Sequence, residues 1–100
     1  MQKLLKHLES QGVKRVIFSG ATELAEIAYL SLHDTNIELA AVFDDLNVGK
    51  RFFDHTVQPV CLLNAIRHDL IILTSTEPPD VMQNRLEEQG VSQEREVIMN

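Results

Sequence analysis

Residues 16–27 read Val-Ile-Phe-Ser-Gly-Ala-Thr-Glu-Leu-Ala-Glu-Ile, and this stretch decides the fold. An apolar run rich in β-branched residues, typical of a buried strand, changes to a helical pattern through a turn with a single glycine. A strand that opens directly into a helix leaves backbone N–H groups pointing outward at the helix N-terminus, where they attract phosphate or another anion. We therefore expect a candidate site at this turn, with backbone donors from Gly20, Ala21, Thr22 and Glu23.

Outward from this turn, strands and helices alternate along the chain. The hydrophobic pattern predicts a helix at 2–11, a strand at 14–19, a helix at 22–33, a strand at 37–43, a loop at 44–59 with a short strand at 56–58, a helix at 59–66, a strand at 69–74, a connection at 75–79, a helix at 80–89 and a strand at 97–99.

This alternation predicts an α/β sandwich, in which helices cover a mostly parallel sheet of five strands. Numbered along the chain, the strands are expected in the order 3-2-1-4-5, so the winding reverses between the strands at 14–19 and 69–74. Ligands of such sheets bind at the reversal, beyond the carboxyl ends of the strands. This places residues 19–23 beside the connection at 74–79.

The composition is that of one soluble domain. The 100 residues are 44% apolar and 24% charged, and the net charge of −6 disfavours nonspecific binding of nucleic acid, whose phosphates reward clustered Lys and Arg. No apolar run approaches the roughly 18 residues of a membrane span, and no secretory signal is evident, so we expect a cytoplasmic protein that does not contact membranes. Cys61 is the single cysteine and is expected to be a reduced, buried thiol.

The turn carries an incomplete form of the dinucleotide-binding fingerprint. In that fingerprint three glycines make the tight turn, admit the pyrophosphate to the backbone, and let the helix lie close to the strand. The corresponding positions here are Gly20, Thr22 and Ala25, so a β-branched residue stands where close approach is needed. Three arrangements remain open: the phosphates lie further out, the Thr22 hydroxyl caps the helix and joins the hydrogen bonds to the anion, or no phosphate binds.

Three further side chains belong to the expected site. Asp44 ends the strand at 37–43, near the spacing from Gly20 at which an acid binds a ribose diol, and it favours NAD over NADP if a dinucleotide binds. A solvated Asp-Asp turn is the alternative. Ser75 and Thr76 follow the strand at 69–74 and are expected to line the opposite wall of the cleft. Their alternative role is helix capping and turn formation.

No constellation of catalytic or metal-binding residues is evident. The four histidines are scattered over different predicted elements, without the spacing of a metal site. Tyr29 is followed four residues later by His33, so the Tyr-x-x-x-Lys pair of short-chain dehydrogenases is missing, and nucleophile elbows and Walker loops are absent as well. We therefore expect a domain that is not an enzyme and holds no metal.

Residues 13–28, with 42–45, 57–59 and 69–74, resemble the CoA-binding-like and NAD(P)-binding Rossmann-like domains. Such domains lie at the C-terminus of some bacterial winged-helix transcriptional regulators, and relatives precede sugar O-acyltransferases and nucleotide-sugar dehydratases. The resemblance covers residues 13 to about 98 and implies a Rossmann-like three-layer sandwich. The family usually has Gly-Ala-Gly at the turn, where this chain has Gly20, Ala21 and Thr22.

The resemblance implies a sensory or substrate-holding module whose activity belongs to another domain. We expect a single domain over 1–100, taken from a longer protein, with 1–12 as a connector helix and NAD, CoA or a nucleotide-sugar as ligand. Two alternatives stay open. One is the substrate-binding fragment of a sugar-modifying enzyme. The other is a degenerate scaffold that forms a homodimer through exposed Phe52, Phe53 or the helix at 2–11.

Overall fold

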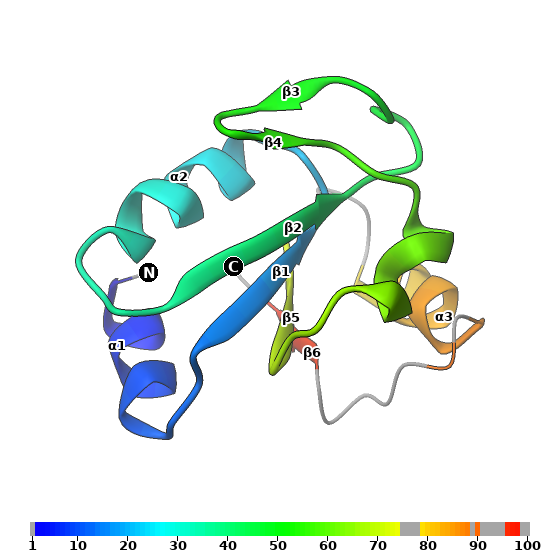
Figure 1. Ribbon diagram of the computed structural model, residues 1–100. Helices are drawn as coiled ribbons and strands as arrows, with labels where there is room; N and C mark the ends of the chain where they lie inside the picture. Colours follow the sequence, from blue (N-terminus) through cyan, green and yellow to red (C-terminus); the bar gives the residue numbers. More distant parts are fainter. Residues whose placement is uncertain (1, 75–78, 89, 91–95, 99–100) are drawn as a thin grey trace.

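The computed structural model describes residues 2–74, 79–88, 90 and 96–98, and Figure 1 shows their arrangement. Strands and helices alternate, as the sequence predicts. In chain order the elements are α1 (Gln2–Ser10), β1 (Arg15–Ser19), α2 (Glu23–Leu32), β2 (Glu38–Phe43), β3 (Arg51–Phe52), β4 (His55–Thr56), the 3-10 helix η1 (Val60–Ala65), β5 (Leu70–Leu73), α3 (Pro79–Glu88) and β6 (Glu96–Ile98).

The main sheet has four parallel strands in the order β2-β1-β5-β6. The α/β class is therefore confirmed, and so is the predicted order of these four strands. β1 lies between β2 and β5, so the winding reverses beside β1 and its carboxyl end meets the carboxyl ends of both neighbours. The turn quoted at the outset begins at this point in the sheet.

In the part of the chain that the structure describes, the short strand expected at 56–58 is not a full strand of the main sheet, which has four strands. Gln58 forms only an isolated parallel bridge to Phe43, beside β2 where the strand was expected. The pairing does not continue past Gln58, because the N–H of Val60 donates to the Asp45 carboxylate at 2.9 Å and η1 begins at that residue.

Apolar residues alternate between the two faces of the sheet and form two clusters. Val16 and Phe18 join residues of α1 and α2 on one face, whereas Ile17 faces Val60 and Leu63 of η1 on the other. A strand that is apolar on both faces is required when both are covered. The consecutive apolar residues of the opening stretch are thereby explained.

Helix α1 packs its apolar side against the first of these clusters. Leu5 is fully buried and Leu8 is nearly so, and both belong to the same cluster as Phe18. Gly12 follows the helix with a φ of 91°, a conformation in which an L side chain is strained. The apolar side of the helix proposed as a dimer contact is thus packed within the domain.

The hairpin places Phe52 and Phe53 in different environments. Phe52 is only 6% exposed and packs edge-to-face on Phe18, with ring centroids 6.2 Å apart. Phe52 is therefore not the exposed contact that the homodimer alternative requires. Phe53 stands in the turn between β3 and β4 with a φ of 52° and remains 42% exposed.

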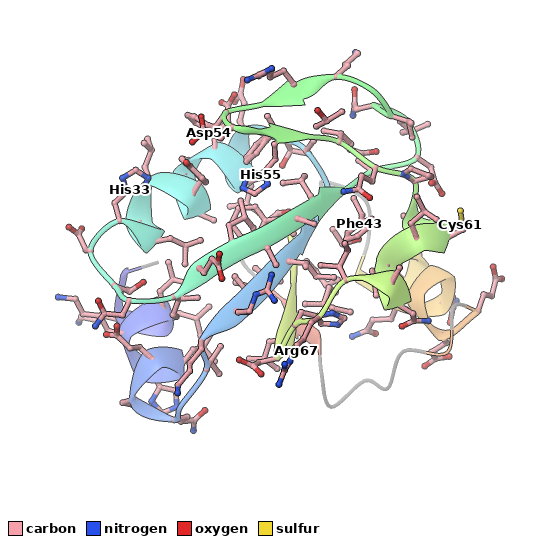
Figure 2. All side chains as sticks on the ribbon, in the orientation of Figure 1. His33, Phe43, Asp54, His55, Cys61 and Arg67 are labelled. Atoms are coloured by element: carbon pink, nitrogen blue, oxygen red, sulfur yellow. The ribbon has the colours of Figure 1, made fainter. Side chains whose placement is uncertain are left out.

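The helix expected at 59–66 is the 3-10 helix η1, and Cys61 is exposed on it rather than buried. A 3-10 helix has three residues per turn, so Val60 and Leu63 fall on the same side and enter the core. Cys61, one position after Val60, then points away from the core, and Figure 2 shows its sulfur on the outer side of η1.

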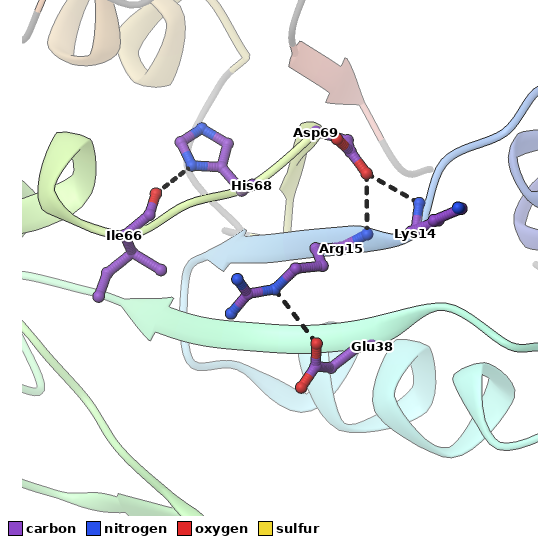
Figure 3. A network of polar contacts seen from close by, with 6 residues as sticks. All are labelled: Lys14, Arg15, Glu38, Ile66, His68 and Asp69. Carbon is purple, nitrogen blue, oxygen red and sulfur yellow. Dashed lines mark hydrogen bonds and ion pairs between the residues drawn. The ribbon is translucent and has the colours of Figure 1, made fainter.

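At the opposite end of the sheet from the turn, Asp69 connects β5 to β1. One oxygen of its carboxylate accepts the backbone N–H groups of Lys14 at 2.9 Å and Arg15 at 3.0 Å, as Figure 3 shows. Its own N–H donates to the carbonyl of Arg15 at 2.8 Å. The donors from Lys14 and Arg15 hold the pKa of the Asp69 carboxyl below its ordinary value of 3.8.

Asp69→Asn is expected to lower the free energy of unfolding at neutral pH and to have little effect in acid. The pKa is lower in the folded state than in the unfolded state, so the stabilisation is complete above about pH 5 and is lost as the pH falls through the folded value. Urea unfolding of both proteins at about pH 7 and about pH 3 measures the difference. A gap that is equally wide at both pH values contradicts this role for the carboxylate.

Candidate functional site

Hydrogen bonds join three strand ends at the turn after β1. The N–H of Gly20 donates to the carbonyl of Phe43 at 2.8 Å, and the N–H of Thr74 donates to the carbonyl of Ser19 at 3.1 Å. The buried Thr74 hydroxyl donates to the carbonyl of Gly20 at 2.7 Å. The predicted proximity of the turn to the residue that follows β5 is thereby confirmed.

Gly20 is needed in this turn because of its backbone conformation. Its φ is 123°, in a region that L side chains rarely adopt. Gly20 is also buried, so its carbonyl relies on the Thr74 hydroxyl in place of water. Glycine thus has a structural reason at this position that is independent of any ligand.

The Thr22 hydroxyl caps helix α2, as one of the three arrangements predicts. Its oxygen accepts the N–H of Ala25 at 3.3 Å, and Thr22 has the extended backbone of an N-cap residue. The same hydroxyl donates its proton to the carbonyl of Thr74. Since a hydroxyl has one proton to donate, Thr22 can offer a ligand only an acceptor lone pair in this geometry.

Asp44 follows β2, and its carboxylate is engaged in the loops around it. One oxygen accepts the N–H of Ala21 at 2.9 Å and the side-chain amide of Asn47 at 2.8 Å, and the other accepts the N–H of Leu46 at 2.9 Å. A carboxylate has about four acceptor positions, so these contacts occupy three of them. Ala21 is also removed from the set of donors that the turn offers to an anion.

The first turn of α2 retains donors. The N–H groups of Glu23 and Leu24 have no carbonyl partner within the helix, because they precede the first residue that can bond back to the N-cap. The exposed side chains of Glu23 and Glu26 lie in the same turn and interact favourably with the positive end of the helix dipole. An anionic ligand would therefore meet two carboxylates beside these donors.

Two of the expected site residues, Ser75 and Thr76, lie outside the described residues. Within the described part of the chain, Ser19 is a buried polar residue at the turn that the sequence did not single out. Its side chain is fully buried, and its hydroxyl has no hydrogen-bond partner there. A buried, unpartnered hydroxyl is unusual in a native fold.

A pocket of about 410 Å³ lies away from the turn, between the second half of α2, the start of β2 and β4. No residue of the expected site lines it. Its lining comes from three elements and the loop between α2 and β2, so no contiguous motif could have indicated it: Tyr29, Leu32, His33, Thr35, Ile37, Glu38, Leu39 and His55.

The described residues contain no group of three or more His, Cys, Asp or Glu side chains placed to hold a metal ion. None of the helices in that part of the chain is long and apolar enough to cross a membrane. A scan of the sequence against models of known protein families finds no match, and a search of the curated proteins finds none either.

Proposed function

We propose that this chain is a noncatalytic, Rossmann-like module that holds a nucleotide-type ligand at the carboxyl ends of β1, β2 and β5. The observation that supports this best is the tie between those ends through Gly20, Asp44 and Thr74. These bonds fix the turn in advance, so a ligand pays little ordering entropy on binding. The N–H groups of Glu23 and Leu24, which have no carbonyl partner within the helix, then serve as donors to a phosphate.

The ligand class in this proposal is NAD, CoA or a nucleotide-sugar. Strand order β2-β1-β5-β6, with Gln58 bridging to the outer side of β2, supports the Rossmann-like assignment. Ser75 and Thr76 remain the proposed far wall of the site. Asp44 remains the proposed ribose contact, beside its hydrogen bonds to Ala21, Leu46 and Asn47.

The module fits best as the cytoplasmic sensor domain of a bacterial transcriptional regulator, in which another domain contacts DNA. The net charge of −6 disfavours direct contact with nucleic acid by this domain. The substrate-binding fragment of a sugar-modifying enzyme is the alternative within the same ligand class.

The proposal is tested by unfolding the protein with and without each nucleotide. NAD, CoA or UDP-glucose is expected to raise the free energy of unfolding by about 2.7 kcal/mol at a concentration one hundred times its dissociation constant. Isothermal titration calorimetry gives that constant. If none of the three stabilises the protein, the nucleotide site is excluded.

Glu23→Pro and Glu23→Ala separate a backbone donor from its side chain. Proline is favoured at the first helical position, and the extended backbone of Thr22 is compatible with a following proline, so the fold is expected to persist. Proline removes the N–H of residue 23, whereas alanine keeps it. We expect Glu23→Pro to weaken nucleotide binding about three- to tenfold relative to Glu23→Ala. Equal affinities would place the phosphates elsewhere.

A dimerisation scaffold is the second candidate, and exposed apolar side chains favour it. Ile27 and Leu30 lie three residues apart on α2 and are 54% and 60% exposed, and Phe53 is 42% exposed. The dimerisation scaffold is supported if no nucleotide binds and if sedimentation shows a dimer whose population rises with protein concentration. A monomer at all concentrations counts against it.

A further inference from the structure

The pocket beside β2 is built separately from the turn. Its floor is formed by buried apolar residues at the end of α2 and the start of β2: Leu32, Ile37 and Leu39. Because the lining residues Glu38 and Leu39 stand at the start of β2, the pocket lies at the opposite end of that strand from Asp44. Its volume of about 410 Å³ falls within the range of small-molecule sites.

Aromatic rings form one wall of the pocket and hold each other in place. Tyr29 stacks on Phe53, with ring centroids 4.2 Å apart and planes 14° from parallel. His33 and Phe52 meet the Tyr29 ring edge-on, with centroids at 5.0 Å and 6.0 Å. Phe53 covers one face of the Tyr29 ring, and a ring held by three neighbours loses little entropy when a ligand packs beside it.

Some polar side chains of the pocket already have a hydrogen-bond or ion-pair partner, and others do not. The Thr35 hydroxyl donates to the carbonyl of Leu32 at 2.8 Å, and the Glu38 carboxylate pairs with the Arg15 side chain at 3.1 Å. The side chains of Tyr29, His33 and His55 make no hydrogen bond to other described residues. All three groups can donate a hydrogen bond, as a ligand that only accepts hydrogen bonds requires.

We propose that this pocket binds a small aromatic acid. Its ring lies on the apolar floor against Tyr29, and its carboxylate accepts hydrogen bonds from His33 at the end of α2 and His55 on β4. Figure 2 shows His55 on the side of the hairpin that faces α2 and β2, and His33 at the far end of α2. A carboxylate only accepts hydrogen bonds and makes stronger ones than a neutral group does. The proposal does not rest on the nucleotide site.

The test compares three probes that share one ring and differ in charge: benzoate, benzamide and benzylamine. Each is titrated into the ¹⁵N-labelled chain to about 20 mM, which detects dissociation constants in the millimolar range. Benzoate is expected to shift the amide signals of residues 33–39 and 55, with the signals of 20–24 unchanged. Its affinity is expected to exceed that of benzylamine about threefold or more. The proposal is overturned if benzoate leaves residues 33–39 and 55 unmoved, or if benzylamine binds as well.

Histidine variants identify the contacts. His55→Ala and His33→Ala are each expected to weaken benzoate binding about three- to tenfold, while His55→Gln keeps part of the affinity because its amide can donate. His33 is exposed, so its variant reports on the pocket even if His55→Ala disturbs the hairpin. His7→Ala, on the exposed side of α1, is the matched control and should leave the affinity unchanged. Unchanged affinity in both His33→Ala and His55→Ala rules out the proposed contacts.

Discussion

Thr74→Val is expected to lower the free energy of unfolding by about 1–3 kcal/mol. Valine has nearly the shape of threonine, so the buried volume after β5 stays filled. The hydroxyl that donates to the carbonyl of Gly20 at 2.7 Å is lost, and that carbonyl belongs to a buried residue. Because it then has neither this donor nor water, the variant carries the desolvation cost of an unpaired acceptor. Urea unfolding monitored by circular dichroism measures the loss.

Thr56→Val is the matched control for this variant. Thr56 is exposed on β4, where a hydroxyl is free to exchange a partner for water, so its replacement should change the free energy of unfolding by about 0.5 kcal/mol or less. An equal cost at both positions would mean that the Thr74 hydroxyl adds nothing beyond its size and shape.

Asp44→Ala is expected to destabilise the domain by about 1.5–3 kcal/mol. The carboxylate accepts hydrogen bonds from Ala21, Leu46 and Asn47 at 2.8–2.9 Å, and hydrogen bonds to a charged group contribute more than neutral ones. Removing it frees the turn after β1 from the loop after β2. We expect the amide signals of both segments to shift together in a ¹⁵N spectrum, in addition to the loss measured by urea unfolding.

Asp54→Ala provides the comparison, since Asp54 is exposed in the hairpin and makes no hydrogen bond to other described residues. Its replacement should change stability by about 0.5 kcal/mol or less. If Asp44→Ala proves equally mild, the Asp44 carboxylate is free to serve a ligand, and its hydrogen bonds to the loops are not needed for the fold.

The sequence predicts the sheet well because its signal there is local. Val16, Ile17 and Phe18 are apolar in succession, and only a strand covered on both faces buries all three. The turn residue Gly20 marks where that strand ends. The alternation of such apolar runs with helical patterns along the chain then predicts the order of four strands and the position of the turn at the winding reversal.

Other features depend on contacts between residues that are distant in the sequence, and a local sequence pattern does not predict such contacts. Gln58 makes only a single bridge to Phe43, because the N–H of Val60 donates to the Asp45 carboxylate and η1 begins at Val60. Cys61 is exposed because Val60 and Leu63, on another side of η1, are the residues that enter the core. Asp44 has the spacing of a ribose ligand, but its hydrogen bonds to Ala21 and to its own loop are visible only in three dimensions.

The hydrogen bonds around the turn have a consequence for how this sequence can diverge. Ala21 and Asp44 are 23 positions apart in the sequence, and Thr22 and Thr74 are 52 positions apart, yet a hydrogen bond joins the two residues of each pair. Residues in one such network do not act independently, so a substitution at one position alters what is tolerated at another. The shape of the turn is therefore encoded by a dispersed set of residues, Thr22, Asp44 and Thr74, and chains that share it need not share a contiguous glycine motif.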